Sequence, residues 1–131
     1  MMGGCLCGQV RYEFEGFSSG IANCHCSMCR RFSGAAYGTF GTVKYASFNW
    51  VCGENTVKTY NSSSKATRGF CSNCGSSQFY RLLGESSDYE IAMGALDKEP
   101  NIEVNANIYC ASKAMWSAGY ENLPKYDAGR A

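Results

Sequence analysis

The segment Asn23–Arg31 places three cysteines within six residues, a spacing that is typical of a metal site. In an extended chain Cys24 and Cys26 fall on one face, and two further residues let the chain turn back so that Cys29 joins them. A structural zinc site takes four protein ligands, whereas three ligands leave one position for water or substrate. We therefore expect an open site of three thiolates.

The residues beside this cluster leave alternatives open. His25 lies between two same-face ligands, so an extended backbone points it away from the metal, but a closed site completed by His25 or by a distant residue is one alternative. A site left empty is another. Arg30 and Arg31 are suited to offset the charge of the thiolates and to bind a substrate carboxylate, and the competing interpretation is a pair of surface salt bridges.

Two further cysteine pairs predict a second kind of site. Cys5-x-Cys7 and Cys71-x-x-Cys74 together supply the four thiolates of a closed tetrahedral zinc site. Gly75 follows the second pair, as expected where a metal knuckle needs a positive φ. The alternative is four ordinary buried thiols. If the four ligate one ion, they close a long loop and stabilise the fold.

The overall use of cysteine favours metal ligation over a disulfide scaffold. The chain has 9 cysteines, an odd number, and all but Cys52 and Cys110 lie in short-spaced clusters. These two have no partner at ligand spacing, and we predict that both are small core residues. Zinc is favoured over an iron–sulfur cluster by the paired spacings. Core positions are also predicted for the aromatic residues Tyr37, Phe40, Phe48, Trp50, Phe79, Tyr80, Tyr109 and Trp116.

Length and charge narrow the classes of function. With 131 residues and 45% hydrophobic content, the chain suits one compact domain over residues 1–131. Its formal net charge is +1 and its basic residues are dispersed, which excludes the footprint of a nucleic-acid binder. It shows no charged leader followed by an apolar run and no long apolar stretch, so we expect no membrane span and a soluble, cytoplasmic protein.

Alternating apolar and polar residues predict a mostly β fold, because no segment sustains a 3.6-residue apolar repeat. The clearest strand is Gln9–Glu15, with Val10, Tyr12 and Phe14 on its apolar face. Arg31–Gly34 is predicted as a turn or a single helical turn. Further strands are expected at Ala35–Phe40, Val43–Tyr45, Phe48–Cys52, Thr56–Tyr60, Ser77–Arg81, Tyr89–Met93 and Ile102–Cys110, separated by short polar and glycine-containing loops.

The ordered motifs resemble a known family. Gly4–Tyr12 reads GCLCGQVRY, Cys24–Arg31 reads CHCSMCRR and Phe70–Gly75 reads FCSNCG, and together they resemble the glutathione-dependent formaldehyde-activating enzymes, also called the centromere-protein-V domain family. Similarity continues through Met93–Asp97 and reaches the tail. The chain has Asn107 where the family often shows histidine.

This resemblance implies an Mss4-like fold of antiparallel sheets with two zinc ions. It implies that Cys5, Cys7, Cys71 and Cys74 hold a structural zinc, and that Cys24, Cys26 and Cys29 hold a catalytic one. The founding activity of the family joins formaldehyde to glutathione, a carbon–sulfur lyase reaction in reverse. The expected partner is therefore a small thiol such as glutathione.

An open zinc site would lower the pKa of a bound thiol from its usual value of about 8.5 and so prepare it for addition to a carbonyl. A proton donor is then needed for the new hydroxyl, and His25 and Tyr37 are the candidates. Two other classes of function remain: a non-catalytic, zinc-stabilised binding module, and a thiol or metal sensor that exchanges its ion. The coordination number at each site distinguishes catalysis from a structural role.

Overall fold

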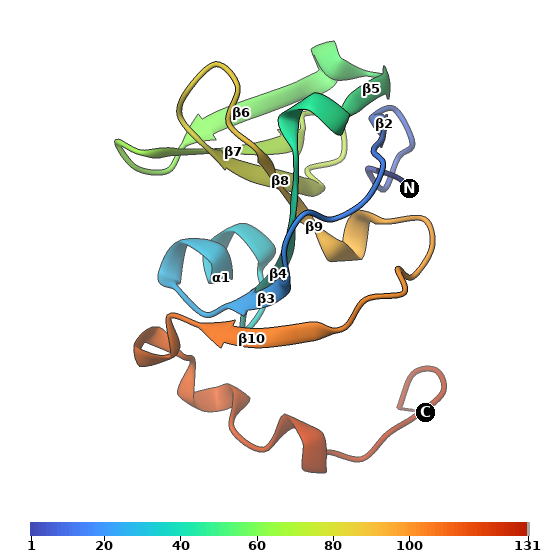
Figure 1. The fold of residues 1–131 in the computed structure, drawn as a ribbon. Helices are drawn as coiled ribbons and strands as arrows, with labels where there is room; N and C mark the ends of the chain where they lie inside the picture. Colours follow the sequence, from blue (N-terminus) through green and yellow to red (C-terminus); the bar gives the residue numbers. More distant parts are fainter. Residues whose placement is uncertain (131) are drawn as a thin grey trace.

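Strands dominate the architecture of this chain, which we describe from a computed structural model covering residues 1–130 (Figure 1). Within those residues ten strands form two sheets, and the one α-helix has seven residues. The predicted mostly β fold is confirmed. Residue 131 and the corresponding end of the expected domain lie outside the described residues.

The larger sheet has seven strands in the order β10-β3-β4-β9-β8-β7-β6. Its neighbours are antiparallel except β10 and β3, which run parallel and so place a late segment of the chain beside an early one. Its strands are β3 (Ile21–Cys24), β4 (Gly38–Val43), β6 (Val57–Asn61), β7 (Ala66–Cys71), β8 (Ser77–Leu82), β9 (Tyr89–Ala92) and β10 (Val104–Ile108).

The smaller sheet is antiparallel, with the order β1-β2-β5. Its strands are β1 (Met2–Gly4), β2 (Arg11–Glu13) and β5 (Asn49–Cys52), and β2 forms the centre of the predicted strand Gln9–Glu15. Single turns of 3₁₀-helix connect the strands and continue into the tail: η1 (Tyr45–Ser47), η2 (Glu54–Thr56), η3 (Met93–Ala95), η4 (Cys110–Ser112), η5 (Met115–Ser117) and η6 (Tyr120–Asn122).

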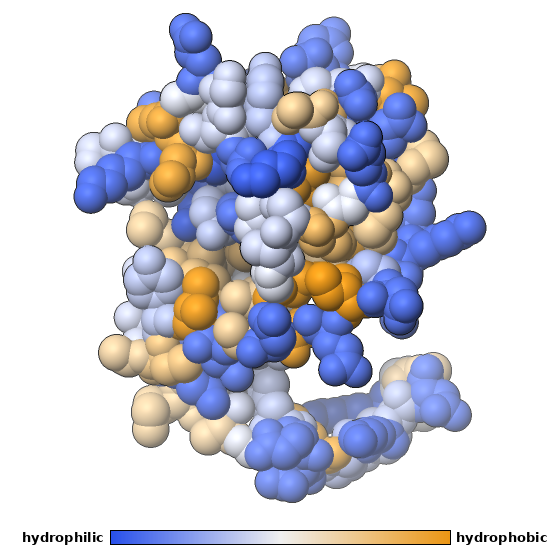
Figure 2. Space-filling view, in the orientation of Figure 1, coloured by the Kyte–Doolittle hydropathy of each residue, from blue (hydrophilic) through white to orange (hydrophobic). Residues whose placement is uncertain are grey.

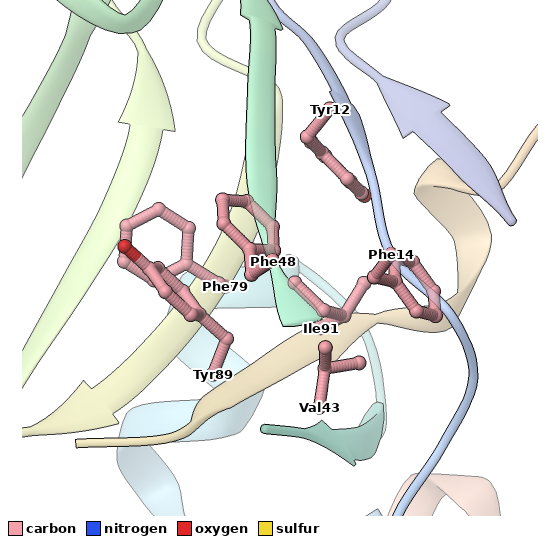
Figure 3. Packing of buried hydrophobic residues seen from close by; sticks show 7 residues of the cluster. All are labelled: Tyr12, Phe14, Val43, Phe48, Phe79, Tyr89 and Ile91. Atoms are coloured by element: carbon pink, nitrogen blue, oxygen red, sulfur yellow. The ribbon is translucent and has the colours of Figure 1, made fainter. Parts of the chain in front are cut away.

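The main hydrophobic core lies where residues of the two sheets meet (Figure 3). Tyr12 of the smaller sheet and Ile91 of the larger one are both fully buried in it. Phe48 stacks on Tyr89 with ring centroids 4.1 Å apart. Burying large aromatic rings from both sheets fixes the sheets relative to each other, because each ring removes a large apolar area from water. The seven residues of the core are Tyr12, Phe14, Val43, Phe48, Phe79, Tyr89 and Ile91.

Helix α1 (Ser27–Ser33) begins earlier and is longer than the predicted turn at Arg31–Gly34. The side chain of Cys26 caps its first turn by accepting a hydrogen bond from the backbone N–H of Cys29. Gly34 ends it with a left-handed φ of 64°, a conformation that glycine adopts without steric cost. The sequence lacks an apolar repeat long enough to reveal so short a helix, and a thiol is an unusual cap.

Several predicted core residues are instead at the surface. Cys52 and Cys110 are both exposed, since one ends a strand of the smaller sheet and the other begins a 3₁₀ turn after β10. Tyr109 and Trp116 are 66% and 64% exposed. All five residues of β10 are exposed because this strand forms the edge of its sheet, and Figure 2 shows the following segment projecting from the rest of the molecule.

The expected strand at Val43–Tyr45 is also wrong. Val43 belongs to β4, whereas Tyr45 begins a 3₁₀ turn, because the backbone N–H of Tyr45 and the ammonium of Lys44 both donate hydrogen bonds to Asp88.

None of the helices in residues 1–130 has the length and apolarity needed to span a bilayer.

Candidate metal centres

The first centre, as we call the group Cys5, Cys7, Cys71 and Cys74, joins the two ends of a long segment of chain. Cys5 follows β1, and Cys71 is the last residue of β7. A packed cluster of Cys5, Val10 and Cys71 anchors the group between the two sheets. The loop that these cysteines close is long, since Cys7 and Cys71 are 64 positions apart.

The sulfur atoms of the first centre are arranged as a metal site requires. All four lie within 4.8 Å of one another, with Cys5 Sγ 3.5 Å from Cys7 Sγ and Cys7 Sγ 3.9 Å from Cys71 Sγ. Four thiolates around zinc at about 2.3 Å lie about 3.8 Å apart, whereas a disulfide requires about 2.05 Å. These cysteines are free thiols. The donor set therefore fits a tetrahedral zinc ion.

Neutral hydrogen-bond donors surround the first centre. The backbone N–H of Val10 donates to Cys5 Sγ at 3.2 Å, and the Ser76 hydroxyl lies 3.2 Å from Cys74 Sγ. The hydrogen bond from Ser76 lowers the pKa of Cys74 to about 5, whereas burial raises the pKa of Cys71 to about 11. As predicted for the knuckle, Gly75 has a positive φ of 78°.

The second centre, as we call the group Cys24, Cys26 and Cys29, lies where β3 meets α1. Cys24 ends β3, Cys26 caps α1 and Cys29 lies in its first turn, so a strand, a cap and a helix each contribute one sulfur. The sulfur atoms all lie within 4.8 Å of one another, with Cys24 Sγ 3.5 Å from Cys26 Sγ. Among residues 1–130, no fourth histidine, cysteine or carboxylate ligand belongs to this group.

Two of the three cysteines of the second centre are buried, and the third is half-buried. Cys24 and Cys29 are 4% and 2% exposed and pack with Phe40, while Cys26 is half-buried. Burial raises the pKa of Cys29 far above its ordinary value, and the pKa of Cys24 is raised for the same reason. For Cys26, burial is outweighed by the N–H of Cys29 and by neighbouring thiols, so its pKa is lowered. A bound cation is the natural means of keeping all three as thiolates.

Arg68 is the residue of this site that the sequence analysis missed. It lies on β7, is only 6% exposed, and donates from Nη1 to Cys29 Sγ at 3.6 Å. The rings of Phe32 and Tyr80 stack on its guanidinium, at 5.3 and 5.2 Å from their centroids. The available signal was an arginine inside a strand that leads directly to Cys71.

Tyr80 lies against the second centre as well. Its ring meets Phe40 edge to face with centroids 5.0 Å apart. Burial raises the pKa of Tyr80, and the neighbouring carboxyl group of Glu90 raises it further. The phenol therefore remains protonated at neutral pH and retains an O–H that can be donated.

The other predicted site residues lie around the centre without touching its sulfur atoms. Arg31 is exposed, Arg30 is half-buried, and the salt bridges found in residues 1–130 include neither of them. His25 is 2% exposed, and its Nε2 lies 3.1 Å from Asn107 Oδ1 rather than joining the ligand group. Tyr37 packs on the imidazole of His25 with centroids 5.0 Å apart.

Two cavities are lined by residues that pack against the second centre, Phe32 in both and Phe40 in one. The larger, of about 830 Å³, is lined in part by Arg31, Tyr37 and Phe40 and extends to Cys5 of the first centre. The smaller, of about 530 Å³, lies between α1 and the β6–β7 hairpin and is lined in part by Phe32 and Arg68. Both have the size of small-molecule sites in proteins.

Comparison with known proteins gives the same answer as the motifs. The family model described as glutathione-dependent formaldehyde-activating enzyme matches residues 1–112, which include both centres. An uncharacterized lyase of Schizosaccharomyces pombe is 27% identical over 106 residues, a match that covers 81% of this chain and 75% of the relative. The crystal structure of a Rhodobacter sphaeroides protein shares the fold, with a TM-score of 0.66 and 24% identity over 82% of this chain and 99% of that one. The chain therefore belongs to the glutathione-dependent formaldehyde-activating enzyme family.

Proposed function

We propose that this protein is a zinc-dependent carbon–sulfur lyase or synthase whose second centre binds a small thiol of the class to which glutathione belongs. The observation that carries the proposal is the donor set of the second centre: three sulfur atoms converge, and no fourth ligand from residues 1–130 joins them. Zinc held there supplies a cation that lowers the pKa of an added thiol and orients it beside an electrophile.

The reaction forms one bond from sulfur to carbon. The thiol loses its proton, its sulfur adds to the carbonyl carbon of formaldehyde or another small aldehyde, and the carbonyl oxygen gains a proton as the new hydroxyl. The lyase direction breaks the same carbon–sulfur bond and returns both reactants. The chain must therefore hold the reactants together and deliver a proton to one oxygen.

The protein residues around the second centre suit these tasks. Cys24, Cys26 and Cys29, which lie where a strand meets a helix and pack with the core residue Phe40, would hold the ion. The phenol of Tyr80 is protonated at neutral pH and packs against the cysteine cluster, and we assign it the role of proton donor to the developing hydroxyl. It replaces His25 and Tyr37 in this role because it packs directly against the cysteine cluster.

The first centre has a structural role in this proposal. Four thiolates complete the coordination of zinc and leave no position for a substrate. Its ligands also join the start of the chain to the end of β7. The expected cytoplasmic location, where free thiols persist, stays a prediction from the sequence.

The experiment is a thiol titration of cobalt-substituted protein, followed through metal–sulfur absorption. Glutathione and other small thiols should shift the spectrum of the wild type and of Cys52→Ser, a control that changes an exposed cysteine outside both centres. Cys26→Ser should lose the response. Formation of the hydroxymethyl thioether from formaldehyde and the best-binding thiol should then be followed by NMR, with Tyr80→Phe slowed about a hundredfold or more. An unresponsive spectrum, together with a fourth protein ligand on the metal, would overturn the proposal.

A further inference from the structure

Arg68 contacts the second centre and also lines the smaller cavity. Its Nη1 donates to Cys29 Sγ at 3.6 Å, its Nε donates to Ser62 Oγ at 3.0 Å, and its guanidinium lies over the rings of Phe32 and Tyr80. An arginine held at two nitrogens and packed on two aromatic rings has lost much of its conformational freedom already. Its remaining nitrogen, Nη2, is therefore preorganised to bind a ligand, because little further freedom is lost on binding.

The charge of Arg68 is not balanced by a carboxylate. The ion pairs found in residues 1–130 are Arg11 with Asp97 and Lys44 with Asp88. A cation that is only 6% exposed is costly unless an anion accompanies it. When the second centre holds its metal, Cys29 is a thiolate and supplies part of that negative charge. Arg68 is thus the counter-cation of the second centre, a role expected from the sequence for Arg30 and Arg31.

The third nitrogen of this guanidinium, Nη2, remains to bind a ligand in the smaller cavity. No acceptor for Nη2 is found in residues 1–130, yet Nη2 is not among the polar atoms sealed from solvent without a partner, and Arg68 lines the cavity. The walls come from two elements, with Met28 and Phe32 on α1 and Tyr60 and Phe70 on the facing hairpin. Figure 1 shows α1 beside this hairpin.

The chemistry of this cavity is that of a site for an amphipathic anion. Apolar and aromatic walls favour a hydrocarbon body, and an unengaged guanidinium nitrogen favours a carboxylate. Its lining contains arginine but neither aspartate nor glutamate, so an ammonium group would find no counter-ion there. The larger cavity lacks Arg68 and has a lining rich in polar side chains.

From this arrangement we propose that the smaller cavity is a substrate subsite in which Arg68 binds the carboxylate of a mercapto-acid with an apolar or aromatic body, whose sulfur reaches the second centre. This assignment rests on the proposed function and narrows its substrate class. Glutathione is disfavoured relative to such thiols, because its γ-glutamyl ammonium group has no partner in this cavity. Arg68 is then a specificity-determining residue as well as the counter-cation of Cys29.

The cavity can be tested without any thiol. We would compare 3-phenylpropionate with 3-phenylpropan-1-ol, which has the same apolar body and no charge, by calorimetry on zinc-loaded protein. The wild type should bind the acid at least about tenfold more tightly than the alcohol, as expected for a hydrogen bond to a charged group. Arg68→Met should remove this preference, and Arg31→Met, the matched loss of an exposed arginine from the same lining, should largely keep it.

Two further variants keep the test decisive if Arg68→Met does not fold. Arg68→Lys retains the charge without the planar fork and should reduce the preference for the acid. Tyr60→Ala changes a wall residue that is 68% exposed, and should weaken both probes equally with an unchanged melting temperature. Equal binding of acid and alcohol by the wild type, or a preference that depends on Arg31 rather than Arg68, would overturn the proposal.

A second measurement separates this inference from the proposed function. In cobalt-substituted protein, 2-mercapto-3-phenylpropionate should shift the metal–sulfur absorption at lower concentration than 2-phenylethanethiol, and Arg68→Lys should narrow the difference. If 3-phenylpropionate binds through Arg68 but no thiol changes the spectrum, the subsite stands and the proposed reaction falls. If thiols change the spectrum with no preference for the acid and no dependence on Arg68, the reaction stands and the subsite falls.

Discussion

The two centres use the same ligand atom in contrasting ways. In the first centre, Cys7 and Cys71 are 64 positions apart, whereas in the second Cys26 and Cys29 are separated by three. The loop-closure entropy of the unfolded chain grows with the logarithm of loop length, so fixing the longer loop removes about 3 kcal/mol more of it. We therefore expect a metal ion at the first centre to stabilise the fold, and the second centre to contribute less to folding and to bind a ligand.

The hydrogen-bond donors next to the sulfur atoms also differ between the two centres. The Ser76 hydroxyl and the backbone N–H of Val10, both neutral, approach the first centre. A buried arginine approaches the second, where one coordination position is also without a protein ligand from residues 1–130. A cation beside three thiolates reduces the repulsion that an incoming anion meets. The contrast between four sulfur atoms with neutral hydrogen-bond donors and three sulfur atoms with a buried arginine yields four predictions.

The largest effect is expected from Cys71→Ser. Losing one ligand of the first centre should release its zinc and unfold the protein, since structural zinc supplies on the order of 10 kcal/mol of folding free energy. Circular dichroism and metal analysis test this, with Cys110→Ser as the control because Cys110 is exposed and outside both centres. A folded Cys71→Ser protein that lacks this zinc and keeps its melting temperature would remove the structural role.

Cys26→Ser should act on binding rather than on folding. The variant should retain its far-ultraviolet spectrum, lose one of two zinc ions and fail to respond to thiols, because the ligands it disrupts constrain only a short loop. Elemental analysis and thermal melts measure both parts, and Cys52→Ser should retain two ions. If Cys26→Ser unfolds and releases both ions together, the two roles have been assigned to the wrong centres.

A smaller effect is expected from Ser76→Ala, which removes the hydroxyl beside Cys74 Sγ without removing a ligand. Partners of metal ligands typically contribute about tenfold or more to affinity, so zinc should bind the first centre about tenfold more weakly. Competition with a chromophoric chelator measures this. Ser72→Ala is the matched control. Ser72 lies in the same turn as Ser76, but its hydroxyl donates to the backbone carbonyl of Thr56 rather than to a sulfur atom. Equal losses in the two variants would exclude a specific role for Ser76.

The smallest effect concerns Glu90, whose strand neighbour is Tyr80 beside the second centre. Burial raises the pKa of this carboxyl above its usual 4.5, although Thr42 donates a hydrogen bond to it. A carboxyl that binds its proton more tightly in the folded state stabilises the fold at pH values below 4.5, and this stabilisation is lost as the pH rises through the folded pKa. At neutral pH the buried charge therefore opposes folding.

Glu90→Gln should accordingly melt at a higher temperature than the wild type at about pH 8, and the difference should shrink toward about pH 5.5. Thermal melts of zinc-loaded protein at several pH values measure this. Glu13→Gln, a change at an exposed position of β2, should show no such trend. A difference between Glu90→Gln and wild type that is constant across this range would show that the lost charge is not its cause.

The sequence by itself indicated the short cysteine clusters that can ligate an ion, because the spacing within each cluster is a local property of the chain. The alternation of apolar residues likewise predicted the β character and most strands, since a strand buried on one face must repeat with period two. The sequence-based prediction failed where burial depends on residues that are distant in the chain. Cys52 and Cys110 resemble small core residues by composition, yet an edge position and a 3₁₀ turn expose them.

Only the tertiary structure decided which arginine contacts the second centre. Arg30 and Arg31 are adjacent to Cys29 in the chain, but α1 turns them away from its sulfur, because consecutive residues of a helix point in different directions. Arg68 reaches Cys29 from 39 positions away, because the larger sheet brings β7 against the helix. Contacts between distant segments depend on how sheets and helices pack, and a single sequence read locally carries no direct signal of that packing.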